Sequence, residues 1–238
     1  MKWSYGVTTV PERIDTYLPT TLKSLSDGGF PEPRLFVDGT EDAADYRSRF
    51  GLEVTARFPR VNLFGSYVLA LWELYLREPS ADRYVIFQDD LLCVRHLRNY
   101  LERCPFPKKG YWNLITHKVN YDMFSRRPGW YRSDQCGRGA VGLVFDRKGV
   151  VDLLISPSII NRPTTAERER AYRLVDAAIN GALGLQGYVE YVHEPSLLDH
   201  TGKDSTVNPP RTQPTPNFPG NEFDASRLRP IPVTDPNY

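Results

Sequence analysis

Six short runs of apolar and β-branched residues recur along the chain, each followed by a polar or glycine-containing segment. Runs of this length that are rich in valine, isoleucine, tyrosine and phenylalanine predict β-strands. The predicted strands cover residues 3–10, 34–39, 83–88, 111–116, 140–146 and 188–193.

Two segments between the first three strands have helical periodicity. Leu18, Leu22 and Leu25 fall on one face of a helix predicted within residues 15–30, which ends at a Gly-Gly pair. A second helix is predicted over residues 65–78, where apolar side chains recur at helical spacing before a proline.

A third helix is predicted to begin at Thr164, where Glu167 completes a capping box, and to continue to residue 184. Strands that alternate with helices in this way are typical of an α/β fold. We therefore expect a Rossmann-like, mixed but mainly parallel sheet flanked by helices.

The composition changes after Lys203. Eight of the twenty prolines lie beyond this residue, and proline fits neither the interior of a helix nor a central strand. We predict one α/β domain over residues 1–206 and a proline-rich C-terminal extension over residues 207–238. That extension is expected to be either an extended arm wrapped on the domain or partly disordered.

Charge and hydropathy exclude several classes of protein. The formal net charge of +1 predicts no strong global attraction to nucleic acid or to a membrane, although a local patch remains compatible with it. The N-terminus turns polar too early for a signal peptide, and no stretch has the roughly 18 apolar residues of a membrane span. We therefore expect a cytoplasmic protein with no membrane partner. Its three cysteines lack C-x-x-C spacing and are expected to be reduced.

Polar residues with ligand-binding chemistry follow three of the predicted strands. The first strand leads into the sequence TTVPER, which ends at Arg13; the second ends at Asp38 and a glycine; the third ends at Gln88, Asp89 and Asp90. Ligands bind beyond the carboxyl ends of the strands in an open α/β sheet. The three strand ends together therefore predict one pocket for a metal-bound nucleotide, although each alone is ordinary loop chemistry.

The adjacent carboxylates of Asp89 and Asp90 need an explanation, because like charges repel and raise each other's pKa. A nearby cation would remove the repulsion, and Mg²⁺ and Mn²⁺ both favour carboxylate oxygens. The alternative is a solvated turn in which Asp90 caps a helix over residues 91–103. The sequence leaves both interpretations open at this point.

The order of these motifs resembles that of the GT-A-fold glycosyltransferases, which depend on nucleotide sugars. The resemblance rests on VTTVPER, LFVDG, RVNLFGSYVLALWELYL, VIFQDD, GRGAVGLVFDR and EPSLLDHTGKDST, and it extends from about residue 5 to residue 206. It implies that Asp38 binds the nucleoside and that Asp90 and His200 hold a divalent metal, Mn²⁺ or Mg²⁺, on the donor diphosphate. It also implies that Lys203 lies near that diphosphate, with Ser205 or Thr206 as weaker candidates for that position.

The implied donor is a nucleotide sugar, with a UDP-sugar favoured. The residues expected to bind it are Thr8, Val10, Arg13, Asp38, Asn62, Gly65, Gln88, Asp89, Gly139, Lys203 and Ser205. One departure stands out, because the family's acidic motif is usually D-x-D and Gln88 occupies its first position. An amide is a poor metal ligand, so metal binding is expected to depend on Asp90 first and on Asp89 second.

Residues 137–142 read GRGAVG and match the dinucleotide-binding pattern G-x-G-x-x-G. That motif functions when it follows a strand and opens a helix. Here a polar segment precedes it and a strand-like run follows it, so we reject a Rossmann dinucleotide site. In a glycosyltransferase these glycines would let the backbone approach the donor sugar or the acceptor.

Transfer of the sugar with inversion requires a carboxylate that takes the proton of the acceptor hydroxyl. We select Asp176 for this role, with Asp134 and Glu194 as weaker candidates; the alternative is that Asp176 is only an exposed helix residue. The acceptor is expected to be a hydroxyl of a glycan, or of a hydroxylated base in modified nucleic acid. The basic segment 108–138 contains Trp112, Tyr121, Trp130 and Tyr131, which form either an acceptor-binding surface or part of the core.

Two further functions remain as alternatives. One is a metal-dependent phosphohydrolase or nuclease built around the paired aspartates. The other is a non-catalytic module that binds nucleotide sugars, which would be consistent with Gln88 in place of an acid.

Overall fold

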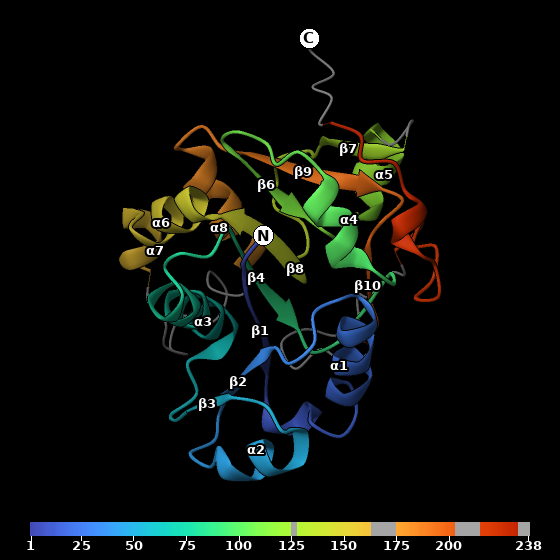
Figure 1. Cartoon of the computed structure of the whole chain (residues 1–238). Helices are drawn as coiled ribbons and strands as arrows, with labels where there is room; N and C mark the ends of the chain where they lie inside the picture. The colour runs from blue at the N-terminus through green and yellow to red at the C-terminus, as the bar shows by residue number, and fades with distance from the viewer. Residues whose placement is uncertain (125–127, 163–174, 203–214, 233–238) are drawn as a thin grey trace.

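A computed structural model describes residues 1–124, 128–162, 175–202 and 215–232. Strands and helices alternate through most of the chain (Figure 1). The strands are β1 (Trp3–Thr9), β2 (Arg34–Asp38), β3 (Val54–Arg57), β4 (Arg83–Gln88), β5 (Leu91–Cys93), β6 (Gly110–Asn113), β7 (Gly129–Arg132), β8 (Gly142–Asp146), β9 (Val189–Glu194) and β10 (Leu198–His200).

The helices include short ones that the sequence did not predict. They are α1 (Leu18–Asp27), α2 (Ala44–Phe50), α3 (Asn62–Arg77), α4 (Leu97–Arg103), α5 (Lys118–Phe124), α6 (Arg147–Leu154), α7 (Pro157–Ile160) and α8 (Val175–Gly184), with 3-10 turns η1 (Pro11–Arg13) and η3 (Ala225–Arg227). The expected helix start at Thr164 lies outside the described residues, whereas the end of that helix is α8.

Eight strands form one mixed sheet in the order β3-β2-β1-β4-β8-β6-β9-β7. The four strands β3, β2, β1 and β4 are parallel neighbours, and β6 is parallel to β9. Strands β8 and β7 run antiparallel to their neighbours. The predicted α/β fold with a mixed, mainly parallel sheet is confirmed.

Helices cover both faces of the sheet, with α1 and α4 on one side and α3, α6 and α8 on the other (Figure 1). Alternate residues of β1 point to opposite faces of the sheet. Val7 packs in the hydrophobic cluster on the side of α1 and α4, while the Ser4 hydroxyl donates to the Leu74 carbonyl on α3. Leu18 and Leu25 of α1 are fully buried, as their helical spacing predicted.

The helix expected over residues 91–103 forms only in its second half. Residues Leu91–Cys93 are strand β5, which pairs with β10, and the helix α4 begins at Leu97 after His96 in a left-handed conformation. The interpretation of Asp90 as a helix cap is therefore wrong. The local sequence did not reveal β5 because its partner strand lies about a hundred residues further along the chain.

Residues 215–232 lie against the face of the sheet that carries α1 and α4. Phe218, Phe223 and Leu228 pack against the hydrophobic cluster of that face, and Ala225 is fully buried. The Arg103 guanidinium donates to the backbone carbonyl of Ser226 at 3.0 Å. Residues 215–232 therefore pack on the domain, while the division of the chain near residue 206 and the character of the whole extension stay predictions.

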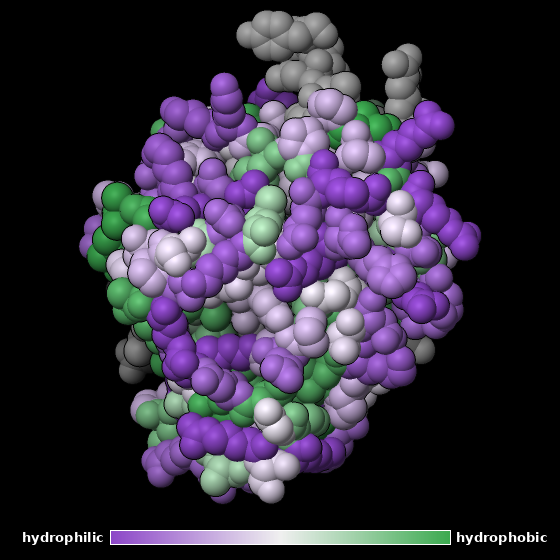
Figure 2. Space-filling view, viewed as in Figure 1, coloured by the Kyte–Doolittle hydropathy of each residue, from purple (hydrophilic) through white to green (hydrophobic). Residues whose placement is uncertain are grey.

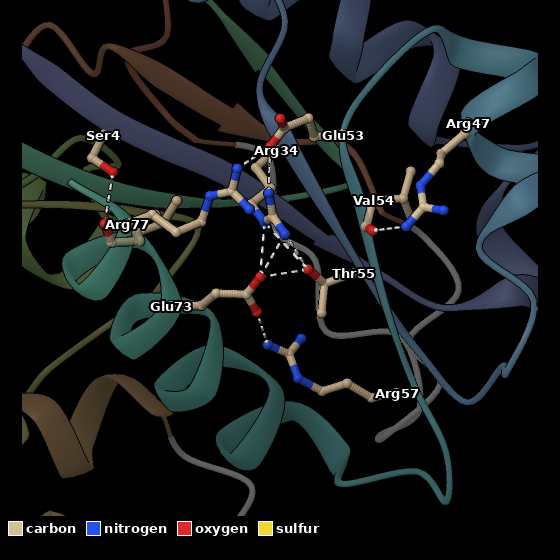
Figure 3. Close-up of polar contacts among 10 residues, drawn as sticks. Ser4, Arg34, Arg47, Glu53, Val54, Thr55, Arg57, Glu73 and Arg77 are labelled. Atoms are coloured by element: carbon tan, nitrogen blue, oxygen red, sulfur yellow. Dashed lines mark hydrogen bonds and ion pairs between the residues drawn. The ribbon is translucent and has the colours of Figure 1, made fainter.

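A polar cluster lies between α3 and the strands β2 and β3 (Figure 3). Glu73 of α3 accepts hydrogen bonds from Arg34 at 3.0 Å and from Arg57 at 3.2 Å. Thr55 donates to the same carboxylate at 2.6 Å. Glu73 is therefore a shared counter-charge for two largely buried guanidinium groups, of which Arg34 also pairs with Glu53, and it connects the edge of the sheet to the helix.

Most of the face seen in Figure 2 is hydrophilic, and hydrophobic residues appear at its left edge over α6 and α7. Ile155, Ile160 and Leu185 expose 56%, 60% and 85% of their surface, so this region holds large apolar side chains outside the core. None of the helices in the described parts of the chain has the length and apolar character needed to cross a bilayer.

Candidate functional site

The paired aspartates lie at the carboxyl end of β4, opposite Arg13, which lies in the turn after the neighbouring strand β1. Strand β1 is parallel to β4 and continues into the 3-10 turn Pro11–Arg13. Arg13 lies within ion-pair distance of both Asp89 and Asp90, and its Nε is 3.1 Å from Asp89 Oδ1. Arg13 thus supplies the positive charge that two adjacent carboxylates require.

Asp89 is held by two partners, Thr9 at the end of β1 and Arg13 in the turn that follows. Only 3% of the residue is exposed, and besides Arg13 it accepts a hydrogen bond from the Thr9 hydroxyl. Burial raises the pKa of Asp89 to about 6, although the Arg13 charge and the Thr9 hydrogen bond act in the opposite direction. The carboxylate of Asp89 is therefore committed to fixing the loop that carries Arg13.

Asp90 faces His200 across the small β5-β10 sheet. Antiparallel pairing places His200 opposite Leu91, and His200 Nε2 lies 2.8 Å from Asp90 Oδ2. Burial acts to raise the pKa of Asp90, but the hydrogen bond and charge of His200 and the Arg13 charge outweigh it and hold that pKa below its ordinary value. Asp90 is thus the more strongly ionised member of the pair.

Two observations indicate that Asp90 and His200 fit a divalent cation. The second oxygen of Asp90, Oδ1, is buried and has no hydrogen-bond partner among the residues that the structure describes. Gly202 lies two residues after His200, and a Cβ at that position would overlap Asp90 Oδ2. Glycine therefore keeps the space beside this carboxylate open. Carboxylate oxygen and imidazole nitrogen are suitable ligands for Mn²⁺, and Mg²⁺ is often held by one or two carboxylates together with substrate phosphates.

No group of three or more His, Cys, Asp or Glu side chains placed to hold a metal occurs within residues 1–124, 128–162, 175–202 and 215–232. A cation at Asp90 and His200 would therefore take its remaining ligands from a bound diphosphate, from water or from outside these residues.

Gln88 has a structural partner that explains the departure from D-x-D. Its side-chain Nε2 donates to the Ala140 carbonyl at 3.1 Å, which connects the end of β4 to the loop before β8. An aspartate could not donate this hydrogen bond. Gln88 therefore positions the GRGAVG segment, and the strand β8 that follows it confirms that this segment is not a Rossmann dinucleotide motif.

The same loop contacts Asp176 in the first turn of α8. The Gly139 amide donates to Asp176 Oδ2 at 2.6 Å, and the Ala177 amide donates to Asp176 Oδ1 at 2.9 Å. Gly139 has a φ of +82°, a left-handed conformation that favours glycine. Asp176 is therefore joined to the site through Gly139, Ala140 and Gln88.

The two weaker base candidates have other partners. Asp134 forms an ion pair with Arg138 at 2.6 Å, and Glu194 accepts a hydrogen bond from Asn217 of the C-terminal arm. These contacts give both carboxylates structural roles.

The ends of β1 and β2 provide further polar groups at this edge of the sheet. Asp38 is 2% exposed, and its Oδ1 accepts the Val61 amide at 2.9 Å beside the start of α3, where Asn62 and Gly65 lie. Burial raises the pKa of Asp38, although the Val61 and Asn62 amides act against that rise. Asp38 thus orients the start of α3.

Thr8 near the end of β1 and Val10 just after this strand have structural contacts. The Thr8 hydroxyl donates to the Phe87 carbonyl at 3.3 Å, and the Val10 carbonyl accepts the Arg13 amide at 3.0 Å. Lys203, Ser205 and Thr206 lie outside the described residues.

Sequence reasoning missed three residues of this site. Thr9 binds Asp89, Gly202 adjoins Asp90, and the Thr21 hydroxyl of α1 donates to the Asp89 carbonyl at 2.7 Å and accepts the Leu91 amide at 3.0 Å. The sequence indicated the first two of these residues only by their positions, Thr9 within TTVPER and Gly202 two residues after His200. Thr21 is an ordinary helix residue whose role depends on packing between distant segments.

The aromatic residues of the basic segment lie mainly in the core. Trp112 and Trp130 are 0% and 1% exposed and stack on each other with ring centroids 4.6 Å apart. Tyr131 is also buried, whereas Tyr121 is partly exposed. The interpretation of these residues as an acceptor-binding surface is therefore wrong for Trp112, Trp130 and Tyr131, because hydrophobic packing uses the same side chains.

A crystal structure of GalNAc-T7 with UDP, GalNAc and Mn²⁺ superimposes on this chain with a TM-score of 0.59 at 10% sequence identity. The chain therefore has a GT-A-like fold. The match covers 84% of this chain and 44% of that chain, so the GT-A-like domain spans less than half the length of the protein it resembles.

A second crystal structure, that of a mannose-1-phosphate geranyltransferase from Thermus thermophilus, matches with a TM-score of 0.49 and 16% identity over 81% of this chain and 74% of that chain. No protein-family model and no curated protein matches the sequence.

Proposed function

We propose that this protein is a glycosyltransferase that transfers a sugar from a nucleotide-sugar donor to a hydroxyl acceptor with the help of a divalent metal. The observation that carries the proposal is the contact between Asp90 and His200 at the carboxyl end of β4, beside a buried Asp90 oxygen that has no hydrogen-bond partner in the described parts of the chain. This pair lies at the edge of a GT-A-like sheet, where ligands bind in open α/β folds.

Asp90 and His200 would hold Mn²⁺ or Mg²⁺, and the bound metal would stabilise the negative charge of the departing nucleoside diphosphate. Arg13 lies beside them and provides a further positive charge at the same edge. Asp38 and the start of α3 would bind the nucleoside, together with the backbone around Thr8 and Val10. Lys203 and Ser205 remain proposals for contacts to the donor.

Asp176 would accept the proton of the acceptor hydroxyl, and the Gly139 amide holds it in place for that role. We favour a UDP-sugar as donor, in keeping with the UDP, GalNAc and Mn²⁺ present in the GalNAc-T7 crystal. The acceptor class is a hydroxyl of a glycan or of a hydroxylated base.

The first experiment is a thermal-shift series with UDP, GDP, CDP, TDP and CMP, each with and without Mn²⁺. A ligand that binds only the folded state raises the melting temperature. We expect one nucleotide, UDP, to stabilise the protein in a metal-dependent way. Absence of any nucleotide effect, or cleavage of a phosphodiester without a sugar acceptor, would contradict the proposal.

A matched pair of variants tests the assignment of Asp90. Asp90→Asn should lose the metal-dependent part of the UDP shift, because the amide is a poor metal ligand. Asp27→Asn is the control, since the side chain of Asp27 is exposed at the end of α1 and pairs with Lys23. Transfer of radiolabelled sugar to an acceptor panel then separates an enzyme from a protein that only binds the donor.

A further inference from the structure

Arg13 pairs with Asp89 and Asp90, and Asp90 is the carboxylate at which the proposed cation would bind. We propose that Arg13 changes partners during ligand binding: it pairs with Asp89 and Asp90 in the free protein and moves to the donor diphosphate when the metal binds. This inference rests on the proposed function and adds a regulatory property to that site. Its consequence is that nucleotide and divalent cation bind cooperatively.

The contact geometry places Arg13 in direct competition with a metal. Arg13 Nη2 and His200 Nε2 both approach the same oxygen, Asp90 Oδ2. The Arg13 side chain is 13% exposed and those of the two aspartates 5% and 4%, so water screens these charges only weakly. A guanidinium and a divalent cation at one carboxylate would repel each other, so the metal should bind well only after Arg13 has moved.

The Arg13 side chain is held in a way that permits this exchange. Its buried Nε and Nη2 face Asp89 and Asp90 and have no other partner among the described residues. The guanidinium also lies over the Tyr17 ring, 4.6 Å from its centroid. A diphosphate offers guanidinium a partner of equal or greater charge, since arginine binds phosphate through paired hydrogen bonds.

Arg13 therefore links the two ligands energetically. A nucleotide diphosphate that attracts Arg13 frees Asp90 for the metal, and a metal at Asp90 frees Arg13 for the diphosphate. Coupling of this kind is reciprocal, because each ligand must strengthen the binding of the other by the same factor.

The test measures Mn²⁺ affinity of the full chain by electron paramagnetic resonance, with and without UDP. In the wild type we expect weak binding of Mn²⁺ alone and much tighter binding with UDP. Arg13→Ala should bind Mn²⁺ alone about tenfold or more tightly than the wild type, because a nearby positive charge is removed. The factor by which UDP strengthens Mn²⁺ binding should shrink in that variant.

Two further variants keep the test decisive. Arg13→Lys retains the positive charge and should bind Mn²⁺ alone with the affinity of the wild type. This variant also provides the test if Arg13→Ala does not fold. Arg49→Ala removes an exposed arginine that pairs with Asp15 and should change neither affinity.

The outcomes separate this inference from the proposed function. Equal or weaker Mn²⁺ binding by a folded Arg13→Ala, while the wild type binds UDP with Mn²⁺, would overturn the exchange and leave the proposed function intact. If Arg13→Ala does not fold, Mn²⁺ binding by Arg13→Lys that is about tenfold tighter than in the wild type would overturn it. A wild type that binds Mn²⁺ neither alone nor with UDP would overturn both.

Discussion

The Gly139 amide and the Asp176 carboxylate are joined by a hydrogen bond of 2.6 Å, which fixes the proposed base against the loop before β8. The other carboxylate oxygen accepts the Ala177 amide. An ionised carboxylate has about four lone-pair sites, so both contacts leave room for an acceptor hydroxyl. The two amides thus orient Asp176 without consuming its capacity to accept a proton.

Asp176→Asn should lower the turnover number by about 10² to 10⁴, because the amide cannot act as a base. The affinity for UDP with Mn²⁺ should stay within about twofold, since Asp176 lies on a different element from Asp90. Asp134→Asn is the comparison, because Asp134 pairs with Arg138 on the same loop. Steady-state kinetics with the best acceptor would compare the two variants. A larger loss of turnover in Asp134→Asn would assign the role of general base to Asp134 instead.

Gly202→Ala should abolish the metal-dependent UDP shift, because the added Cβ would overlap the Asp90 carboxylate. Gly181→Ala is a suitable control: its Cβ would meet no described atom within 4 Å, and alanine favours a helix more than glycine does. Differential scanning fluorimetry of both variants with UDP and Mn²⁺ tests this. An unchanged UDP shift in a folded Gly202→Ala would mean that Asp90 tolerates displacement.

Glu190 should make the stability depend on pH near neutrality. It is buried, accepts hydrogen bonds from Ser133 at 2.6 Å and Asn113 at 3.1 Å, and faces the charges of Asp134 and Asp176. Burial raises the pKa of Glu190 from 4.5 to about 7. The folded state then holds more protons than the unfolded state between these values, so the contribution of Glu190 to stability is fully present below pH 4.5 and is lost as the pH rises through 7.

Glu190→Gln should remove this component, which amounts to up to about 3 kcal/mol. The side-chain oxygen of the glutamine can still accept from the Ser133 hydroxyl or from the Asn113 amide, so the variant keeps one of these two hydrogen bonds and we expect it to fold. Urea unfolding at several values between about pH 5.5 and 8.5 would measure the slope in both proteins. Parallel slopes would show that Glu190 is not the group responsible.

Glu73→Gln should lower the free energy of unfolding by about 1 to 3 kcal/mol, because it leaves Arg34 and Arg57 without their shared counter-charge. The side chains of these arginines are only 13% and 12% exposed. Glu53→Gln should cost no more than about 1 kcal/mol, since the Glu53 side chain is 67% exposed. Urea titrations of both variants test the difference, and equal losses would argue against a special role for Glu73.

Local sequence was sufficient for most strands of the sheet, although not for β3 and β7, and for the strand ends at the site. Apolar runs specify β1, β2, β4, β8 and β9, because a buried strand must be apolar along most of its length. The same pattern located Asp38 and the Asp89-Asp90 pair, since side chains at the ends of parallel strands meet at one edge. Helices α1 and α3 followed from their leucine and aromatic spacing.

Contacts between distant segments decided the rest. His200 reaches Asp90 across 110 residues, only because β10 pairs with β5 in one register. Arg13 pairs with both aspartates because β1 and β4 are neighbours, and Gln88 binds a carbonyl on the loop before β8. Hydrogen bonds and ion pairs of this kind depend on the three-dimensional packing, so the sequence determined which groups are available and the tertiary structure determined which of them meet.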